Sequence, residues 1–447
     1  MAASLRDVKI LLAAVFLRRA SFGITSQVLT LFLVSLGISK TSVGLFMTLT
    51  LLGDTLISLG LTWYSERLGR RVVMITGCVL MVAAGLMFAQ SLSFWVLLSA
   101  AVLGVISTSG DETGPFKSVE EACLSHLIPP ELRAFTFATY GLLGTLGSAV
   151  GSFMCGGLVL YWSTVFHWPL ERCYRTSFVV YAFIGLLKLA LSLTLSNECE
   201  LDLRAHGRAA ASLGDANPPS ISTEPHSQPL LEDGVYSDYC AKQEPFTANT
   251  FAPETLLYLP RLLVVFMLDS FGYGFMPPAW IVYYFKTVYD ASPAFVGTLF
   301  FFTNLVDSIS SVVSALAFLA FGPVKAILVA QLPSAAFFAN VPLWDSYIAA
   351  AAFYFLFCAC ATMDVVPRQI LLTHLFPARD LTRALGLVNI AKTFARCIGP
   401  LFSGRIAELG RLDIAFYINS ACLLAANTIL GCSFMHLDQS ILRAHGK

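Results

Sequence analysis

The stretch "TWYSERLGRR", residues 62–71, puts one acid and three arginines into ten positions. It joins two apolar runs, 41–63 and 72–91, and each is about as long as the roughly 20 residues that a helix needs to cross a bilayer. Arginine favours the cytoplasmic ends of such helices. The stretch therefore predicts a helical hairpin that crosses a membrane twice, with this basic loop on the cytoplasmic side.

The composition agrees with a membrane protein. Hydrophobic residues make up 56% of the chain, charged residues only 13%, and the mean hydropathy is +0.72. A soluble globular domain has roughly 25% charged residues. The fold class that we predict is an all-α integral membrane protein. The formal net charge of zero gives no reason to expect a nucleic-acid partner.

Apolar runs of spanning length recur along both halves of the chain. We predict an N-terminal six-helix bundle within 1–197, a C-terminal six-helix bundle within 258–437 and a short tail at 438–447. The expected helices are 9–36, 41–63, 72–91, 94–122, 134–161, 175–197, 258–285, 293–318, 322–341, 345–375, 382–409 and 413–435.

The segment 198–257 separates the two bundles and has a different composition. It contains ten acidic residues against three arginines or lysines, and much serine and proline. Such a segment lacks the apolar residues for a core and is predicted to be a mostly disordered linker. Because basic residues concentrate in alternate loops, we expect the linker and both termini in the cytoplasm. Which membrane holds the protein is left open.

The two halves resemble each other in order. "SFG" at 21–23 recurs at 270–272, and "VGLF" at 43–46 is answered by "VGTLF" at 296–300. An acid follows each of these glycines by ten residues, as Asp54 and Asp307. "SHLIPPELRA" (125–134) is similar to "THLFPARDLTRA" (373–384). These matches indicate a duplicated bundle, an architecture typical of transporters with a substrate site between the halves.

The loop at 62–71 also resembles the motif G-x-x-x-D-R-x-G-R-R of the major facilitator superfamily, with Thr62 and Glu66 as departures. The resemblance implies the 12-helix major facilitator fold and a cytoplasmic latch that holds the outward-open state. Its residues would be Glu66, Arg67, Arg70 and Arg71. A plain positive-inside anchor is the alternative reading of these arginines.

Two glycine-rich stretches carry the resemblance further. "GSAVGSFMCGGL" (147–158) partly matches an antiporter motif of the family, and "IGPLFSG" (398–404) has a similar make-up. Small residues allow close helix packing, and proline permits bending, so either packing or a hinge is expected. The arginine of another family motif is replaced by Ala100, which argues against that route of proton antiport. The residues assigned to packing or hinge are Gly147, Gly151, Gly156, Pro115, Gly399 and Pro400.

The stretch "DETGPFKSVEE" (111–121) follows an apolar run and holds four acids and one lysine. Charge at the bilayer centre costs about 2.5–3.5 kcal/mol per residue on insertion scales, so these side chains must face protein or water. Pro115, together with Gly110 and Gly114, is expected to distort the helix near Asp111 and Glu112. We assign Lys117, Glu120 and Glu121 to a gate, together with Asp364 and Arg368 of the other half. A solvated helix extension, with Lys117 and Glu121 paired four residues apart, is the alternative reading of the first three. A Glu120–Arg368 salt bridge across the cytoplasmic seam is one expected use of them.

Other helices also carry ionisable residues near mid-depth. Buried pairs can be purely structural, but as a set they indicate a cavity that handles charge or protons. Acids there are candidate proton sites, and the basic pair of helix 11 would suit an anionic substrate. The pathway residues that we predict are Arg18, Arg19, Asp54, Asp111, Glu112, Asp269, Asp307, Lys392 and Arg396.

The resulting functional expectation is a secondary transporter that moves a small organic solute by alternating access, coupled to protons. A uniporter or an anion symporter of the same fold is the alternative, and a receptor or scaffold that has lost transport is a third class. We expect the substrate, protons and lipid as partners and a monomeric protein. Since no nucleophile–base set or metal-ligand spacing stands out, we expect neither an enzyme nor a cofactor or metal.

Overall fold

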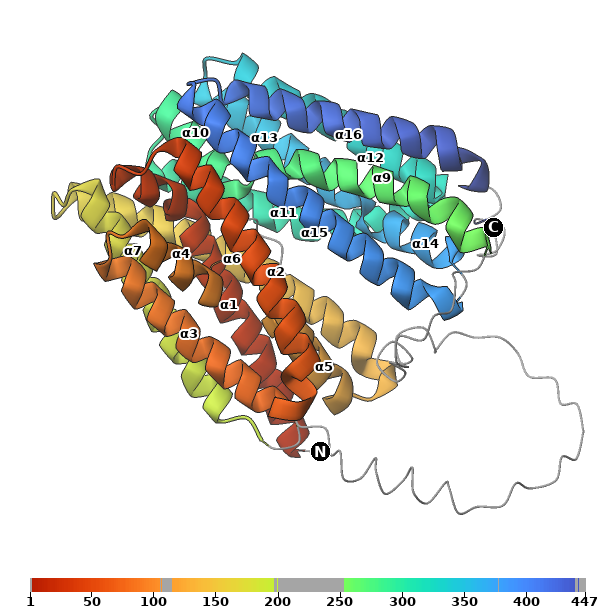
Figure 1. Cartoon of the computed structure of the whole chain (residues 1–447), viewed down its shortest axis with the longest axis horizontal. Coiled ribbons are helices and arrows are strands. Elements are labelled where there is room, and N and C mark those ends of the chain that lie inside the picture. The colour runs from red at the N-terminus through yellow and green to blue at the C-terminus, as the bar shows by residue number, and fades with distance from the viewer. Residues whose placement is uncertain are drawn as a thin grey trace, which may run out of the picture.

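The computed structural model describes residues 2–104, 106, 115–196, 199, 253–376, 378–438 and 441. Over these residues it is built of helices and contains no strand. The chain order is simple: one group of helices precedes the segment at 200–252, and a second group follows it (Figure 1).

The first half begins with the long helices α1 and α2, which are joined by a turn at Gly37, a glycine with a φ of 78°. Helix α4 ends at Leu103 and α5 begins at Pro115, whose missing N–H is tolerated at the first position of a helix. The helices of this half are α1 (Ala2–Ser35), α2 (Lys40–Leu68), α3 (Arg70–Gln90), α4 (Phe94–Leu103), α5 (Pro115–Leu127), α6 (Pro130–Thr164) and α7 (Leu170–Leu193).

In the second half, two expected helices are broken. Pro277 and Pro278 separate α9 from α10, and a short turn (η4, Thr362–Asp364) separates α13 from α14. The helices are α9 (Pro253–Phe275), α10 (Pro278–Val288), α11 (Pro293–Phe321), α12 (Pro323–Asn340), α13 (Tyr347–Ala361), α14 (Val365–Leu375), α15 (Ala378–Glu408) and α16 (Asp413–Phe434), with further short turns η3 (Val341–Leu343) and η5 (Met435–Leu437).

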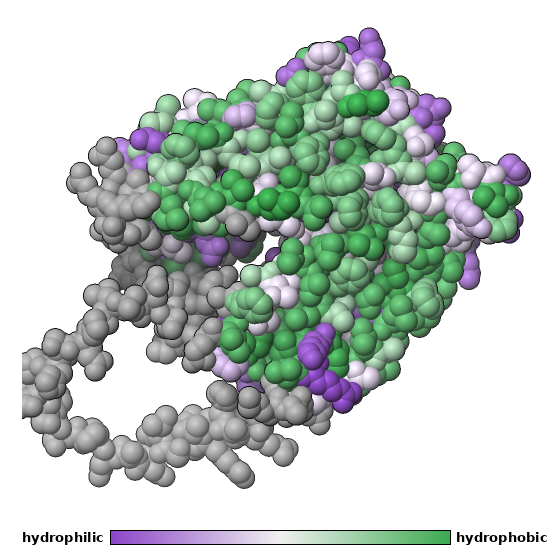
Figure 2. All heavy atoms as spheres, turned by 180° about the vertical axis from the view of Figure 1, so that it is seen from behind, coloured by the Kyte–Doolittle hydropathy of each residue, from purple (hydrophilic) through white to green (hydrophobic). Residues whose placement is uncertain are grey.

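Among the described residues, eight helices are long and apolar enough to cross a membrane, or nine if the bent helix α11 counts as one span. Helices α1 and α15 fall outside this set although they are long, because both carry several charged residues. The surface supports a membrane setting. Large apolar side chains such as Trp95, Phe135 and Phe183 are 68%, 74% and 58% exposed, and hydrophobic residues cover much of the face seen in Figure 2. The chain is an integral, multi-pass membrane protein.

The two halves meet at one end of the molecule and diverge towards the other (Figure 1). We call the end with the turns after α1, α6, α10 and α15 the sealed end, and the end with both chain termini the open end. At the sealed end, one hydrophobic core is shared by both halves and includes Phe32 and Phe46 of the first and Trp280 and Phe285 of the second. Towards the open end each half has a separate core. The shared core holds the two halves together at the sealed end.

Glycines allow the backbones of the two halves to touch at the sealed end. Helix α2 crosses α15 at Gly44 and Gly404, whose Cα atoms are so close that a Cβ built on Gly44 would lie 2.9 Å from the Cα of Gly404. Helix α6 crosses α11 in the same way at Gly156 and Gly297. Two matching crossings of this kind are what a duplicated bundle predicts when its halves pack face to face.

Candidate functional site

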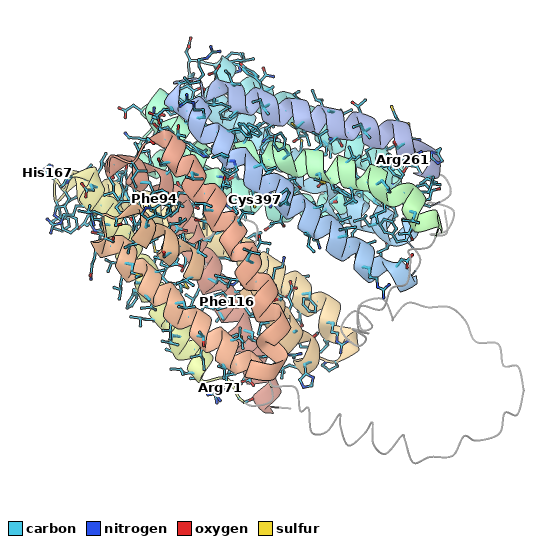
Figure 3. The ribbon with its side chains drawn as sticks, viewed as in Figure 1. Arg71, Phe94, Phe116, His167, Arg261 and Cys397 are labelled. Carbon is cyan, nitrogen blue, oxygen red and sulfur yellow. The ribbon has the colours of Figure 1, made fainter. Side chains whose placement is uncertain are left out.

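A cavity of about 810 Å³ lies between the two halves. Its walls come from α1, α5 and α6 of the first half and from α9 to α16 of the second. In Figure 3, His167 labels the sealed end, Arg71 and Arg261 the open end, and Cys397 a level between them. The charged side chains that line the cavity, among the described residues, are Arg19, Lys117, Asp269, Asp307, Asp364, Arg368, Lys392 and Arg396.

The middle level of the cavity combines side chains from both halves. Arg19 lies halfway along α1, and Arg396 extends from α15 with its guanidinium 4.8 Å from the ring centroid of Tyr273. Asp307 of α11 lines the same cavity close enough to Arg19 for their charges to interact. Four of the predicted pathway positions are thus cavity-lining residues of the second half, and Arg19 faces them from the first.

Nearer the open end, the second half holds a charge cluster on α9, η4, α14 and α15. The Arg368 guanidinium donates to Asp269 at 2.6 Å and forms an ion pair with Asp364. Lys392 lies near both carboxylates, and its ammonium is 6.0 Å from the ring of Phe266. The Arg368 guanidinium therefore forms ion pairs with two carboxylates, and these ion pairs connect α14 to α9 and to η4.

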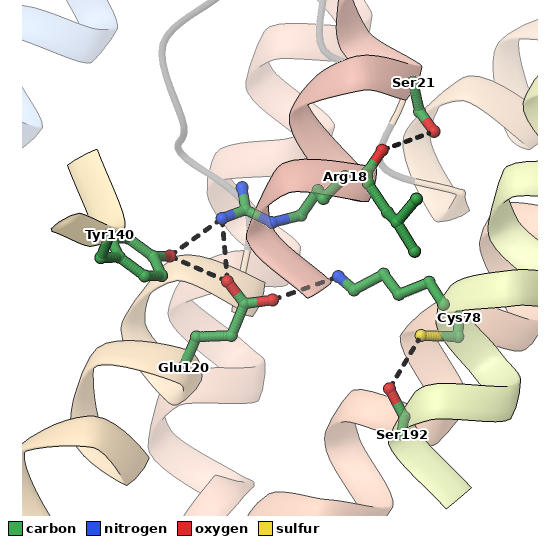
Figure 4. A network of polar contacts seen from close by, with 8 residues as sticks. Arg18, Ser21, Cys78, Glu120, Tyr140 and Ser192 are labelled. Atoms are coloured by element: carbon green, nitrogen blue, oxygen red, sulfur yellow. Dashed lines mark hydrogen bonds and ion pairs between the residues drawn. The ribbon is translucent and has the colours of Figure 1, made fainter. Parts of the chain in front are cut away.

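The first half holds a different cluster, which is deeply buried (Figure 4). The Glu120 carboxylate is fully buried and lies 2.9 Å from Arg18 on one oxygen and 3.2 Å from Lys188 on the other. Tyr140 donates its hydroxyl to the first oxygen at 2.8 Å and accepts from Arg18 at 2.9 Å. The Lys188 ammonium also lies 3.6 Å from the ring centroid of Phe116. Two cations thus share one carboxylate in the interior.

Sequence reasoning missed Lys188 and Tyr140. Lys188 is the lone charged residue of the apolar run "VVYAFIGLLKLALSL" (179–193), and a lysine that deep in a span was the available signal. Tyr140 has no comparable signal, since tyrosine is common in membrane helices. The predicted pathway acids Asp111 and Glu112 lie outside the described residues. The observed pair is Arg18 with Glu120.

The expected salt bridge between Glu120 and Arg368 is not present in this structure. Glu120 binds Arg18 and Lys188 within the first half, and Arg368 binds Asp269 and Asp364 within the second. The physical reason is that each half satisfies its own buried charge by packing helices of the same bundle. The repeat is still visible, because each half joins its first helix to its fourth by an ion pair, with the signs of the charges exchanged.

The predicted latch lies at the open end, within the first half. Arg70 donates to the carbonyl of Ala122 at 3.2 Å and Arg71 to the carbonyl of Leu193 at 2.9 Å. The bond from Arg71 reaches the last residue of α7, and carbonyls at a helix C-terminus favour a cation. The side chains of Glu66 and Arg67, at the end of α2, fall outside the described part of the chain. The latch role stays a prediction.

The remaining predicted gate and pathway residues are spread more widely. Lys117 lines the cavity, and the neighbouring Glu121 is half-buried on α5. Asp54 is 3% exposed and near Cys397, which puts it between α2 and α15 rather than on the cavity wall. Only the helix start is described for Pro115.

The glycines assigned to packing or hinge lie at helix contacts. A Cβ on Gly147 or Gly151 would meet backbone oxygens of α1 at 2.4 and 2.0 Å, and one on Gly156 would meet the Pro293 oxygen of α11 at 2.4 Å. Gly399 packs against Gly274 of α9, with 2.2 Å left for a Cβ, and the oxygen of Pro400 contacts Gly44. These positions permit close approach of backbones. A hinge motion at them stays a prediction.

Comparison with known proteins gives a family. The model of the Major Facilitator Superfamily matches residues 11–222 and 262–441. An uncharacterized membrane protein of Saccharomyces cerevisiae is 41% identical over 438 residues, covering 98% of this chain and 96% of the relative. The match to both halves agrees with the duplication seen in the sequence.

Solved structures agree on the fold. A D-xylose–proton symporter superposes with a TM-score of 0.67 at 15% identity, covering 96% of each chain. A bacterial homologue of the human lysosomal transporter Spinster, inward-facing and occupied, gives 0.67 at 14% identity over 97% of each chain. A human organic anion transporter gives 0.55 at 17% identity, over 96% of this chain and 99% of its own. The predicted fold, two helical bundles related by a repeat, is confirmed.

Proposed function

Because the chain belongs to the major facilitator superfamily, a family of membrane transporters, we propose that it is a secondary active transporter that moves a small organic solute by alternating access, coupled to protons. The observation that carries the proposal is the cavity of about 810 Å³ between two halves that are sealed at one end only. A site that both bundles line becomes accessible from the other side when the bundles rock about it.

The distribution of basic residues between the two ends indicates which end faces the cytoplasm. The open end carries Lys9, Arg70 and Arg133 of the first half, while the sealed end carries fewer basic residues, with Lys40 and Arg411 among them. The positive-inside rule then assigns the open end, both termini and the linker to the cytoplasm. On this assignment the structure is an inward-facing state.

Asp307 is our candidate for the proton site. It lines the middle of the cavity beside Arg19, whereas Asp269 and Asp364 are both held by Arg368. A carboxylate that can exchange a guanidinium partner for a proton can couple proton binding to solute binding. Asp54, away from the cavity wall, is less suited to this role.

The experiment is uptake into proteoliposomes, with a solute chosen by its ability to raise the melting temperature of the purified protein. We expect an inward proton gradient to drive accumulation, and Asp307→Asn to abolish accumulation while exchange of solute across the membrane persists. Asp413→Asn, at the sealed end, is the control and should behave like wild type. If Asp307→Asn still accumulates solute against its gradient, the carboxyl is not the coupling site.

Two alternatives give different results in the same assay. A uniporter would equilibrate the solute with no response to the proton gradient, and an anion symporter would respond to it only for acidic solutes. For a receptor or scaffold, the acidic linker would carry the activity. Deleting residues 205–250 should leave the flux of a transporter unchanged, so a protein that binds solute without flux, before and after the deletion, would favour the receptor.

A further inference from the structure

The described part of the cavity wall has more cationic than anionic side chains. Among the described residues that line it, five side chains are cationic and three are carboxylates. Two of these carboxylates, Asp269 and Asp364, are already bound to one guanidinium, that of Arg368. The third, Asp307, lies beside Arg19. A cavity with this balance attracts anions and repels cations.

The charges are arranged in two levels along α9 and α15. Asp269 and Tyr273 are four residues apart on α9, and so are Lys392 and Arg396 on α15, so each pair spans one helical turn of about 6 Å. The level nearer the open end holds Asp269, Asp364, Arg368 and Lys392. The upper level, nearer the sealed end, holds two guanidinium groups from opposite halves, Arg19 and Arg396, with the ring of Tyr273 against Arg396 and the Asp307 carboxyl beside Arg19.

Apolar and aromatic side chains complete the upper level. Phe22 of α1 lies 5.1 Å from the Arg19 guanidinium by its ring centroid, and Phe300, Tyr354 and Phe357 line the same cavity. Five amide side chains are among the described residues that line the cavity, and two of them donate to backbone carbonyls. Asn304 donates to the Phe300 carbonyl at 2.6 Å and Gln331 to the Ala361 carbonyl at 2.9 Å.

From this arrangement, and resting on the proposed function, we infer that the transported solute is an organic anion with an aromatic or otherwise flat apolar body. Its acidic group binds between Arg19 and Arg396, and its body lies against Tyr273 and the neighbouring aromatic rings. Guanidinium groups match the geometry of carboxylate, phosphate and sulfonate oxygens. Because Arg19 belongs to one half and Arg396 to the other, an anion between them draws the halves together.

Alternating access itself favours this substrate class. The cavity must close on both sides during each cycle, and closing it around excess positive charge in a low-dielectric interior is costly. A bound anion offsets that charge, so the loaded protein closes more readily than the empty one. A cationic solute would add to the unfavourable charge, and a neutral solute would leave it unchanged.

The test uses matched sets of small molecules that differ only in charge: indole-3-acetate, indole-3-acetamide and tryptamine, and likewise phenylacetate, phenylacetamide and phenethylamine. Binding to the purified full-length protein is measured by the rise in melting temperature with ligand concentration. We expect the two acids to stabilise the protein and the amides and amines to have little effect. Acetate, which has the charge without the ring, should bind much more weakly than either aromatic acid.

Variants then locate the binding groups. Arg19→Gln and Arg396→Gln should each weaken the affinity for the acids by about 10- to 100-fold, as expected for the loss of one charge-assisted hydrogen-bonding partner. Arg19→Lys keeps the charge and should fall between wild type and Arg19→Gln. Arg411→Gln is the matched control, since Arg411 is 64% exposed at the sealed end. Each variant is scored only for ligand response, after its own unliganded melting curve shows a cooperative transition.

The inference is overturned if the amides or amines bind as well as the acids, if neither acid binds, or if both glutamine variants keep wild-type affinity. These results are separable from a failure of the proposed function. Anion binding without flux in proteoliposomes would support the anion-binding site and contradict the proposed transport function. Flux of an amine or amide would support the proposed transport function and contradict the inference that the solute is an anion.

Discussion

At the scale of single residues, two adjacent arginines have opposite roles. Arg18 points into the first bundle and binds Glu120, whereas Arg19 lines the cavity between the bundles. Successive residues of an α-helix point about 100° apart, so one helix can serve both an internal cluster and a transport path. In the second half both arginines line the cavity: Arg368 of α14 pairs with Asp269 and Asp364, and Arg396 of α15 lies against Tyr273.

Glu120 is the buried carboxylate that joins Arg18, Lys188 and Tyr140 in the first bundle. In Glu120→Gln, Arg18 and Lys188 would stay buried without the carboxylate, and removing one partner of a buried ion pair typically costs about 3–5 kcal/mol. We expect a large fall in the melting temperature of the protein in detergent. The matched control is Glu171→Gln, because Glu171 is 45% exposed and pairs with Arg175 on one helix; the change there should be no more than about 1 kcal/mol.

A second variant separates charge from packing at this cluster. Combining Glu120→Gln with Lys188→Met removes one of the two buried cations and keeps an apolar chain of similar length. The double variant should regain part of the stability lost in Glu120→Gln. Equal losses in Glu120→Gln and Glu171→Gln, or no recovery in the double variant, would show that the cluster is not held by its charges.

At the scale of helices, the crossings at the sealed end depend on glycine. Both crossings bring backbone against backbone, with α6 on α11 at Gly156 and α2 on α15 at Gly44. Side chains cannot yield there as they do in an ordinary core, because the atoms that a new Cβ would meet belong to the opposing main chain. The crossings therefore set how tightly the sealed end can close.

Gly156 and Gly157 offer a matched pair of substitutions on one helix. A Cβ at Gly156 would lie 2.4 Å from the Pro293 oxygen, whereas a Cβ at Gly157 meets nothing within 4 Å. Gly156→Ala should destabilise the sealed end by about 1–3 kcal/mol, as overpacking does elsewhere, and reduce flux, while Gly157→Ala should match wild type. Melting temperature and uptake test both. Indistinguishable behaviour of the two variants would mean that α6 and α11 separate there at little cost.

At the scale of the whole molecule, the halves are joined by a shared core and by polar contacts at their rim. Lys40 donates to the Ala407 carbonyl at 3.2 Å, and the Thr41 amide donates to the Glu408 carboxylate at 3.2 Å. These bonds link the start of α2 to the end of α15. These bonds must break whenever the sealed end opens. Preventing the two helix ends from separating therefore tests the proposed rocking motion.

Locking this rim should stop transport. With cysteines at Thr41 and Glu408 joined through disulfides by a short bis-methanethiosulfonate reagent, the protein should remain in the state seen here and lose most of its flux. A thiol reductant cleaves these disulfides and should restore the flux. Each single-cysteine variant treated with the same reagent is the control. Undiminished flux in the cross-linked protein would show that the sealed end does not open during transport, against alternating access at this rim.

The assignment to integral membrane proteins, most of the helical segments and the duplicated bundle could be predicted from the sequence alone. The reason is that hydrophobic length and repeated motifs are local properties of the chain. It also picked out Arg19, Asp307 and Arg396, since an ionisable residue in an apolar run is conspicuous. The ion-pair partner of each buried charge becomes known only from the tertiary structure. Arg18 and Glu120 are 102 residues apart, and Asp269 and Arg368 are 99 apart. Which charges meet depends on how helices pack and rotate within each bundle, and no local pattern encodes that.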